Sequence, residues 1–334
     1  MSNISLPSYS VVDFTSRSGG TDCELVVRCK GKCFIVALHA NIFKNSPTIL
    51  KEYLQFLKVI EEDYPVNNLT DEDFYDWIME PFHNLLGSLP SVGGRPTLQD
   101  YFFGEAFHYT VYLDGDKRLP IESEKVQLAP FKGMRLTSEF YLDWPVFNPR
   151  QVESLEDNPD ARPSKVLVNG SLTCYLKYSY WGDNRTAERE LTTYTRIKHS
   201  DLREDIRVPR LYGLVEDDNG LILGLLLTYV DCEGLDMACA VAPDTPRSLR
   251  ERWGRQVTYA LKSLHQAGIV WGDAKPHNIL INRNQDAWIV DFGGDHSRGW
   301  VDKEKAGTIE GDLQGLTKIL EYLSIDTQVY ETFS

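Results

Sequence analysis

The first part of the chain alternates short apolar runs with polar turns, as expected for β-strands joined by hairpins. Residues 24–28 and 33–38 are rich in β-favouring side chains, and the polar residues 30–32 between them include a glycine. A further apolar run at 107–113 is followed by an Asp-Gly-Asp turn. The pattern therefore predicts several strands before residue 120.

Two stretches between these strands carry apolar residues at the spacing of an amphipathic helix. The first runs from about 47 to 60, and the second follows Thr70, which forms a capping-box pattern with Asp73. Pro81 should end or kink the second helix, because proline has no backbone N–H and clashes with the preceding turn. We find no chemical motif in residues 1–150 and interpret them as an accessory α+β region.

Prolines and acidic residues become frequent at 147–163, where we expect a linker. Beyond it, the apolar pattern predicts two hairpins with a helix between them, followed by a long amphipathic helix. The predicted strands are 166–168, 172–180, 211–215 and 224–227, and the predicted helices are 185–197 and 246–266. We expect three domains, at residues 1–150, 161–230 and 231–334.

Residues 264–294 contain a further hairpin that brings polar side chains together. Residues 279–281 and 288–290 are apolar runs on either side of a polar turn. Folding this hairpin carries Asp291 back beside Asn278, close to Asp273. Because Mg²⁺ binds one or two carboxylates together with phosphate oxygens, the sequence predicts a magnesium site here.

The stretch Gly272-Asp273-Ala274-Lys275-Pro276-His277-Asn278 and the triplet Asp291-Phe292-Gly293 resemble the catalytic loop and the metal-binding DFG of the protein-kinase-like superfamily. The spacing from Asp273 to Asp291, 18 residues, is typical of that family. The resemblance implies that ATP and Mg²⁺ are the cofactors. It implies catalytic roles for Asp273 and Lys275, metal ligation by Asn278 and Asp291, and a place in the nucleotide site for Gly293.

Two charged residues nearer the middle of the chain extend the resemblance. Lys177 lies in a predicted strand, where the family has a lysine that pairs the phosphates of ATP, although a surface lysine on an edge strand would look the same. Glu190 lies in the next predicted helix, where the family has the glutamate that pairs this lysine, and Glu188 is the competing candidate. A buried ammonium needs such a partner.

The family resemblance also implies an adenine-binding hinge between two lobes and a buried carboxylate below the catalytic loop. The segment Thr228-Tyr229-Val230-Asp231 resembles this hinge, and the resemblance places Leu227 behind the adenine ring. Asp312 resembles the buried aspartate that supports the catalytic loop. The implied fold class is α+β: a bilobal protein-kinase-like fold with a truncated C-terminal lobe and an N-terminal α+β extension.

Three features depart from the family pattern. No GxGxxG sequence precedes Lys177, Gly272 stands where protein kinases have arginine, and only 21 residues separate Asp291 from Asp312. The glycine is shared with aminoglycoside phosphotransferases and other small-molecule kinases, whereas Lys275-Pro276 is the protein-kinase form. The whole is most similar to divergent kinase-like proteins common in filamentous fungi.

We therefore expect an ATP- and Mg²⁺-dependent phosphotransferase that phosphorylates a hydroxyl, more readily on a small molecule than on a protein. The alternatives are a pseudokinase that binds nucleotide or regulates a partner, a protein Ser/Thr kinase, and a kinase-like site recruited for other chemistry. A pseudokinase is favoured by the missing glycine loop and opposed by the joint presence of Lys177, Asp273, Asn278 and Asp291.

The composition of the chain indicates which kinds of partner it binds and in which cellular compartment we expect it. Apolar residues make up 42% of the 334 residues, which is enough to bury a core, and the formal net charge is −14. This negative charge argues against nucleic acid or an anionic membrane as partner. The six cysteines show no CxxC pair, the N-terminus lacks a signal-peptide pattern, and the longest apolar stretch is too short to span a bilayer. We expect a soluble, cytoplasmic protein.

Overall fold

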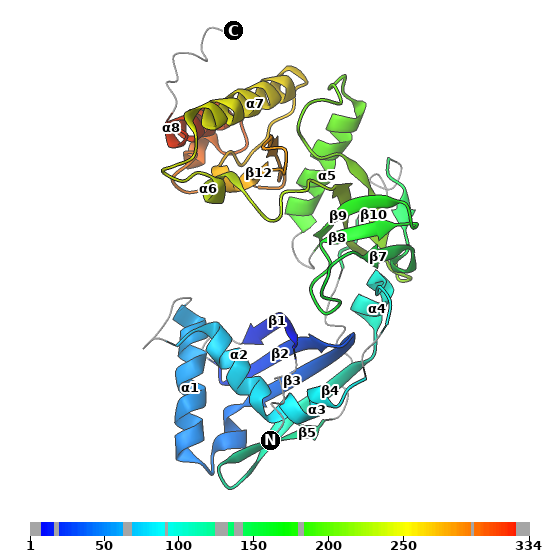
Figure 1. The fold of residues 1–334 in the computed structure, drawn as a ribbon, viewed down its shortest axis with the longest axis vertical. Coiled ribbons are helices and arrows are strands. Elements are labelled where there is room, and N and C mark those ends of the chain that lie inside the picture. Colours follow the sequence, from blue (N-terminus) through cyan, green and yellow to red (C-terminus); the bar gives the residue numbers. More distant parts are fainter. Residues whose placement is uncertain are drawn as a thin grey trace. The chain divides into compact units, whose positions relative to one another are not determined.

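A computed structural model gives the fold of the chain (Figure 1) and describes residues 8–16, 20–62, 69–90, 93–123, 133–136, 143–179, 184–294 and 297–324. The chain divides into two compact units. Of these residues, the first unit contains those up to 123 together with 150–164. The second contains 133–136, 143–149 and all those from 165 onwards.

The first unit is built on a five-stranded sheet whose strands lie in chain order. These are β1 (Ser10–Ser16), β2 (Asp22–Cys29), β3 (Lys32–His39), β4 (Ala106–Asp114) and β5 (Lys117–Glu122). Neighbouring strands are antiparallel except β3 and β4, which are parallel and therefore need the long helical connection between them. The hairpin predicted around residues 30–32 is confirmed, with Lys30 and Gly31 at φ of 50° and 78° in its turn.

The connection from β3 to β4 is helical. It consists of η1 (Ala40–Phe43), α1 (Pro47–Glu62), α2 (Asp71–Met79), η2 (Glu80–Phe82), α3 (His83–Gly87) and α4 (Leu98–Phe103). The Thr70 hydroxyl accepts a hydrogen bond from the Asp73 N–H at 3.2 Å, and the Asp73 carboxylate accepts from the Thr70 N–H at 2.8 Å. This confirms the predicted capping box, and α2 ends before Pro81 as predicted. Side chains of α1 and α2 such as Tyr53 share one apolar core with Leu25 of the sheet.

The segment that we expected to be a linker packs onto the first unit instead. It contains η4 (Pro149–Gln151) and β7 (Val152–Ser154), in which Glu153 forms a β-bridge with Thr97. The Asp160 side chain is buried, and its two oxygens each accept a 2.6 Å hydrogen bond, from the N–H groups of Lys30 and Gly31. One boundary between the compact units lies at residue 150, but residues 143–149 before it belong to the second unit and residues 150–164 after it to the first.

In the second unit, a twisted sheet carries a single helix between its strands. In spatial order the strands of this unit are β6 (Val146–Phe147), β10 (Leu211–Glu216), β11 (Ile222–Thr228), β9 (Leu172–Tyr178) and β8 (Lys165–Val168). The helix is α5 (Asn184–His199). β8 to β11 pair in antiparallel fashion, as the two predicted hairpins require.

The rest of the second unit is mainly helical. Its elements are α6 (Met237–Ala240), α7 (Arg247–Gln266), η5 (Pro276–Asn278), β12 (Ile279–Ile281), β13 (Ala287–Ile289), η6 (Lys303–Lys305) and α8 (Ile309–Tyr322). One apolar core joins this part to the sheet, since Leu191 of α5 and Leu225 of β11 belong to the same cluster as Leu261 of α7. The sheet lobe and the helical lobe together confirm the predicted α+β, bilobal class. Among the described residues, no helix combines the length and apolar character that crossing a bilayer demands.

Candidate active site

The β12–β13 hairpin brings Asn278 and Asp291 together. Ile279 pairs with Ile289, and the N–H of Val290 donates to the carbonyl of Asn278 at 3.0 Å. Asp291, the next residue, therefore lies beside Asn278, as the apolar pattern predicted. Asp291 has φ of 62°, which is uncommon for a residue other than glycine and turns the chain sharply at this point.

Asp273 and Asn278 are held to each other by the loop between them. The Asn278 side-chain amide donates to the backbone carbonyl of Asp273 at 3.0 Å and to its Oδ2 at 2.9 Å. Asp273 is 5% exposed, and its other oxygen, Oδ1, is buried without a hydrogen-bond partner among the described residues. Because a buried acceptor without a partner is costly, Oδ1 is the atom of this loop most in need of a donor.

Lys275 neutralises the same carboxylate. Its ammonium lies 2.7 Å from Oδ2 of Asp273 and donates to the Ser297 hydroxyl at 2.8 Å. One oxygen of Asp273 is thus occupied by Lys275 and Asn278, while the other is buried and has no hydrogen-bond partner among the described residues. Ser297 was not predicted, because nothing in the sequence around it marks a contact with residue 275.

Lys177 sits between two carboxylates that come from different parts of the second unit. Its Nζ atom lies 2.9 Å from Glu190 of α5 and 2.8 Å from Oδ1 of Asp291. Of the two glutamates considered from the sequence, Glu190 is the one that reaches this ammonium. The Glu190 side chain is 3% exposed and that of Lys177 28%, so the ion pair is largely sheltered from water.

The charged groups of this cluster shift one another's pKa values. Burial lowers the pKa of Lys177, but Glu190 and Asp291 outweigh burial, and the net pKa of the lysine is raised. Burial raises the pKa of Glu190, and Lys177 only partly opposes it. Burial raises the pKa of Asp291, but the nearby charge of Lys177 lowers it by more, so the net pKa of Asp291 is lowered. The ammonium and the Asp291 carboxylate are therefore both charged at neutral pH.

Asp312 supports the loop that carries Asp273. Its Oδ2 accepts from the backbone N–H of Trp271 at 2.7 Å and lies 2.9 Å from Nε2 of His265, and its Oδ1 accepts from Gly272 N–H at 2.8 Å. Asp312 is 2% exposed. These bonds confirm the support predicted from the sequence. Gly272 has φ of 92°, a conformation that glycine adopts without strain.

The two glycines after Phe292 lie against the charged groups. A Cβ atom on Gly293 would come within 2.9 Å of the Thr186 methyl and 3.3 Å of Glu190, both on α5. A Cβ on Gly294 would come within 2.3 Å of the Cβ of Asp273. The pair Gly293-Gly294 was visible in the sequence, but only the structure shows that the second glycine makes room for Asp273.

The predicted hinge leaves the sheet beside the strand that carries Lys177. β11 pairs with β9, and Leu225 is the residue opposite Lys177. Leu227 and Val230 are buried, the Thr228 hydroxyl accepts from the N–H of Arg210 at 2.9 Å, and the Lys165 ammonium lies 4.6 Å from the centroid of the Tyr229 ring. Leu227 and Thr228 thus lie on the strand next to the one that carries Lys177, and contact of the four residues with an adenine ring remains a prediction.

The side-chain oxygens of Asn278 and Asp291 could hold Mg²⁺ only together with the oxygens of a bound phosphate. Both oxygens of the Asp291 carboxylate and the side-chain oxygen of Asn278 are hard ligands of the kind that Mg²⁺ prefers. The described residues include no group of three or more His, Cys, Asp or Glu side chains arranged for a metal. A cation here would therefore complete its coordination with the oxygens of a bound phosphate and with water, which is the usual arrangement for Mg²⁺ at a nucleotide.

Comparisons with known proteins find protein kinases. Residues 177–314 match the protein kinase domain family. A protein of Dictyostelium discoideum named as a probable serine/threonine-protein kinase is 29% identical over 108 residues, which are 32% of this chain and 14% of that protein. The serine/threonine-protein kinase PrkC of Bacillus subtilis is 29% identical over 123 residues, 35% of this chain and 17% of PrkC. The mitogen-activated protein kinase HOG1 of Scheffersomyces stipitis is 45% identical over 53 residues, 15% of this chain and 14% of that kinase.

The matched region begins at Lys177 and includes every residue of the charged cluster as well as Asp312. For residues 177–314, this match confirms the resemblance to the protein-kinase-like superfamily that the motifs indicated. The chain spans less than a fifth of the length of the relatives named above, where 14% to 17% of each is covered.

Proposed function

We propose that this chain transfers the terminal phosphoryl group of Mg²⁺-ATP to a hydroxyl group. The observation that supports this most directly is the cluster of Lys177, Glu190 and Asp291, together with an Asp273 carboxylate whose Oδ1 has no hydrogen-bond partner among the described residues. Phosphoryl transfer asks a protein chiefly for positioning and for neutralisation of charge, and this cluster supplies both.

Each side chain has a role that follows from its contacts. Lys177, braced by Glu190, would orient the phosphates, and Asn278 and Asp291 would hold the magnesium ion. Bound magnesium would supply positive charge at the phosphate oxygens. Oδ1 of Asp273 would accept the hydrogen bond, and then the proton, of the acceptor hydroxyl, because this is the carboxylate oxygen without a partner.

Lys275 and the hinge complete the proposed site. Lys275 keeps positive charge next to the carboxylate at 2.7 Å and so lies where it could stabilise the transferred group. Adenine would bind along Leu227 and Thr228 at the end of β11 and along Tyr229 and Val230, which follow this strand. Gly293, packed against α5, would leave room for the phosphates beside Asp291.

The preference for a small-molecule acceptor that we drew from the sequence has no support in the comparisons, since the relatives are named as protein kinases. One of its grounds was Gly272, and the backbone φ of 92° explains a glycine there without reference to the acceptor. A serine or threonine hydroxyl of a protein fits the site as well and is the acceptor to test first.

A nucleotide-binding module without turnover is the second candidate. The observation that favours it is the turn between β8 and β9, where Asn169 and Gly170 have φ of 48° and 66° and no further glycine precedes Lys177 in the hairpin. Backbone N–H groups of a glycine-rich loop normally cradle phosphates, so a two-residue turn offers fewer of them.

The two candidates separate in a phosphate-transfer experiment. The protein is incubated with Mg²⁺-ATP labelled on its γ-phosphate, once with a degenerate Ser/Thr peptide library and once with an aminoglycoside mixture. Label on either acceptor that disappears in Asp273→Asn and persists in Asp205→Asn, an exposed carboxylate paired with Arg203, supports the enzyme. Nucleotide binding with equal background label in wild type and Asp273→Asn would support the module without turnover.

A further inference from the structure

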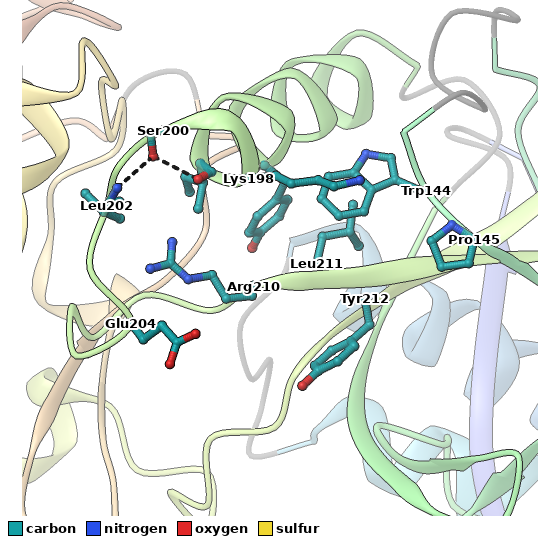
Figure 2. Close-up of a pocket in the computed structure, with 11 residues that line it drawn as sticks. Trp144, Pro145, Lys198, Ser200, Leu202, Glu204, Arg210, Leu211 and Tyr212 are labelled. Atoms are coloured by element: carbon teal, nitrogen blue, oxygen red, sulfur yellow. Dashed lines mark hydrogen bonds between the residues drawn. The ribbon is translucent and has the colours of Figure 1, made fainter.

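A cavity in the second unit lies toward the C-terminal end of α5, away from the charged cluster. It has a volume of about 420 Å³ and is walled by Trp144, by the last turns of α5 and by the start of β10 (Figure 2). This volume is within the range of small-molecule sites, which is roughly 300–1,000 Å³. No residue of the proposed nucleotide site lines it.

The walls of the cavity are mostly apolar and are fixed in place. The Trp144 ring is 7% exposed, donates to the Thr195 hydroxyl at 3.3 Å and carries the Lys198 ammonium 4.5 Å from its centroid. The Ser200 hydroxyl donates to the carbonyl of Ile197 at 2.8 Å and accepts from the N–H of Leu202 at 3.3 Å, which fixes the chain where it leaves α5 (Figure 2). A preformed apolar cavity of this kind binds ligands without first having to order its walls.

Arg210 brings an unsatisfied positive group to this apolar site. Its Nη2 donates to the carbonyl of Arg203 at 2.9 Å, but its Nη1 is buried without a hydrogen-bond partner among the described residues. Burial lowers the pKa of Arg210, and the charge of Glu204 offsets this only in part. In Figure 2 the guanidinium lies between Leu202 and Glu204, at the opposite end of the drawn residues from Trp144. A buried guanidinium nitrogen without an acceptor calls for an anionic oxygen.

The cavity also touches the element that positions Lys177. Tyr194 lines it, is 1% exposed, and stands one helical turn after Glu190 on the same face of α5. The Tyr194 ring packs edge-on against Phe292 at a centroid distance of 5.6 Å, and Phe292 follows Asp291 directly. A ligand against Tyr194 would therefore act on a side chain that packs on Phe292, the residue after Asp291, and that lies one helical turn from Glu190.

We propose that this cavity is a regulatory site for a small amphipathic carboxylate, whose apolar body lies against Trp144 and whose anionic group binds Nη1 of Arg210. Tyr194 links the site to Glu190 and Phe292, so that occupancy changes the affinity for nucleotide. Binding of the carboxylate is argued from the cavity alone, whereas its effect on nucleotide affinity rests on the proposed function.

Calorimetric titration with 2-naphthoate and with its neutral counterpart 2-naphthamide tests the site. We expect wild type to bind naphthoate at least about tenfold more tightly than the amide, and Arg210→Met to lose at least about tenfold in naphthoate affinity. Arg247→Met, which removes an arginine 80% exposed on α7, should bind as wild type does. If naphthoate fails to bind at millimolar concentration, or binds Arg210→Met as tightly as wild type, the site is refuted.

Two further measurements keep the result interpretable. If Arg210→Met does not fold, Tyr212→Ala removes an apolar wall whose residue is 43% exposed, and the same loss of naphthoate affinity is expected. Mg²⁺-ATP is then titrated with and without saturating naphthoate. A change in nucleotide affinity supports the link through Tyr194, and an unchanged affinity refutes the regulatory role. Absence of Mg²⁺-ATP binding even without naphthoate contradicts the proposed function instead, so the two failures are distinguishable.

Discussion

The Nζ atom of Lys177 lies 2.8 Å from Oδ1 of Asp291, although 114 residues separate the two along the chain. This contact joins β9 of the sheet to the end of the β12–β13 hairpin in the helical lobe. Glu190 shares the ammonium at 2.9 Å, so one cation balances two carboxylates. The arrangement predicts what happens when the cation is removed.

Lys177→Met should destabilise the protein by roughly 2–4 kcal/mol at pH 8, because it leaves the buried Glu190 carboxylate without its cation. The loss should shrink toward pH 5. Burial raises the pKa of Glu190 above its ordinary value even beside Lys177. Without the lysine, the folded state binds this proton more strongly than the unfolded state, so acid relieves the penalty. Urea unfolding at both pH values measures it, with the exposed Lys303→Met as control. An equal loss at both pH values would contradict the pairing.

Asp312→Asn should lower the stability of the second unit by about 2–3 kcal/mol, since a carboxamide cannot accept from both backbone N–H groups that Asp312 now satisfies. Asp302→Asn changes a carboxylate whose side chain is 53% exposed and should cost less than about 0.5 kcal/mol. Urea unfolding followed by tryptophan fluorescence compares the two. Equal stability of the Asp312 variant and wild type would show that the loop does not depend on this support.

The elements around Asp273 and Asp291 could be predicted from sequence because their signals are local. The apolar runs of β12 and β13 set the hairpin, and the hairpin sets the meeting of Asn278 and Asp291. The match of the protein kinase domain to residues 177–314 confirms the predicted resemblance of this stretch to the protein-kinase-like superfamily.

Other features escaped prediction because they depend on contacts between distant residues. The proline-rich composition of residues 150–164 indicates irregular backbone, but it does not reveal that Asp160 binds the turn at Lys30, 130 residues away. The contact of Lys275 with Ser297 and the cavity beside Trp144 are likewise made by side chains from separate segments. Such contacts cannot be predicted from the spacing of apolar residues or from the positions of turn residues.

Gly294→Ala should abolish phosphoryl transfer, with a loss of about 10² or more, while the fold is kept. The added methyl group would lie 2.3 Å from the Cβ of Asp273 and 2.6 Å from its Oδ2, so the carboxylate must move. Gly87→Ala, where nothing lies within 4 Å, is the matched control. The rate of phosphoryl transfer to whichever acceptor is labelled measures the effect. A wild-type rate in Gly294→Ala would contradict the catalytic role of Asp273.

Asp160→Ala should release residues 150–164 from the first unit, because two 2.6 Å hydrogen bonds to the β2–β3 turn are lost. We expect limited proteolysis to cut this segment in the variant at least about tenfold faster than in wild type. The exposed Asp157→Ala serves as control. Equal cleavage rates in the two variants would show that Asp160 does not hold the segment in place.

Binding of Mg²⁺-ATP is the measurement that tests the central claim most directly. Isothermal titration calorimetry compares wild type with Asp291→Asn, each with magnesium and with excess chelator. The account predicts binding to wild type that depends on magnesium and is weakened at least about tenfold in Asp291→Asn, because the lost carboxylate is the charged metal ligand. Binding of equal strength in the variant, or binding that is indifferent to magnesium, would contradict the assignment of the site.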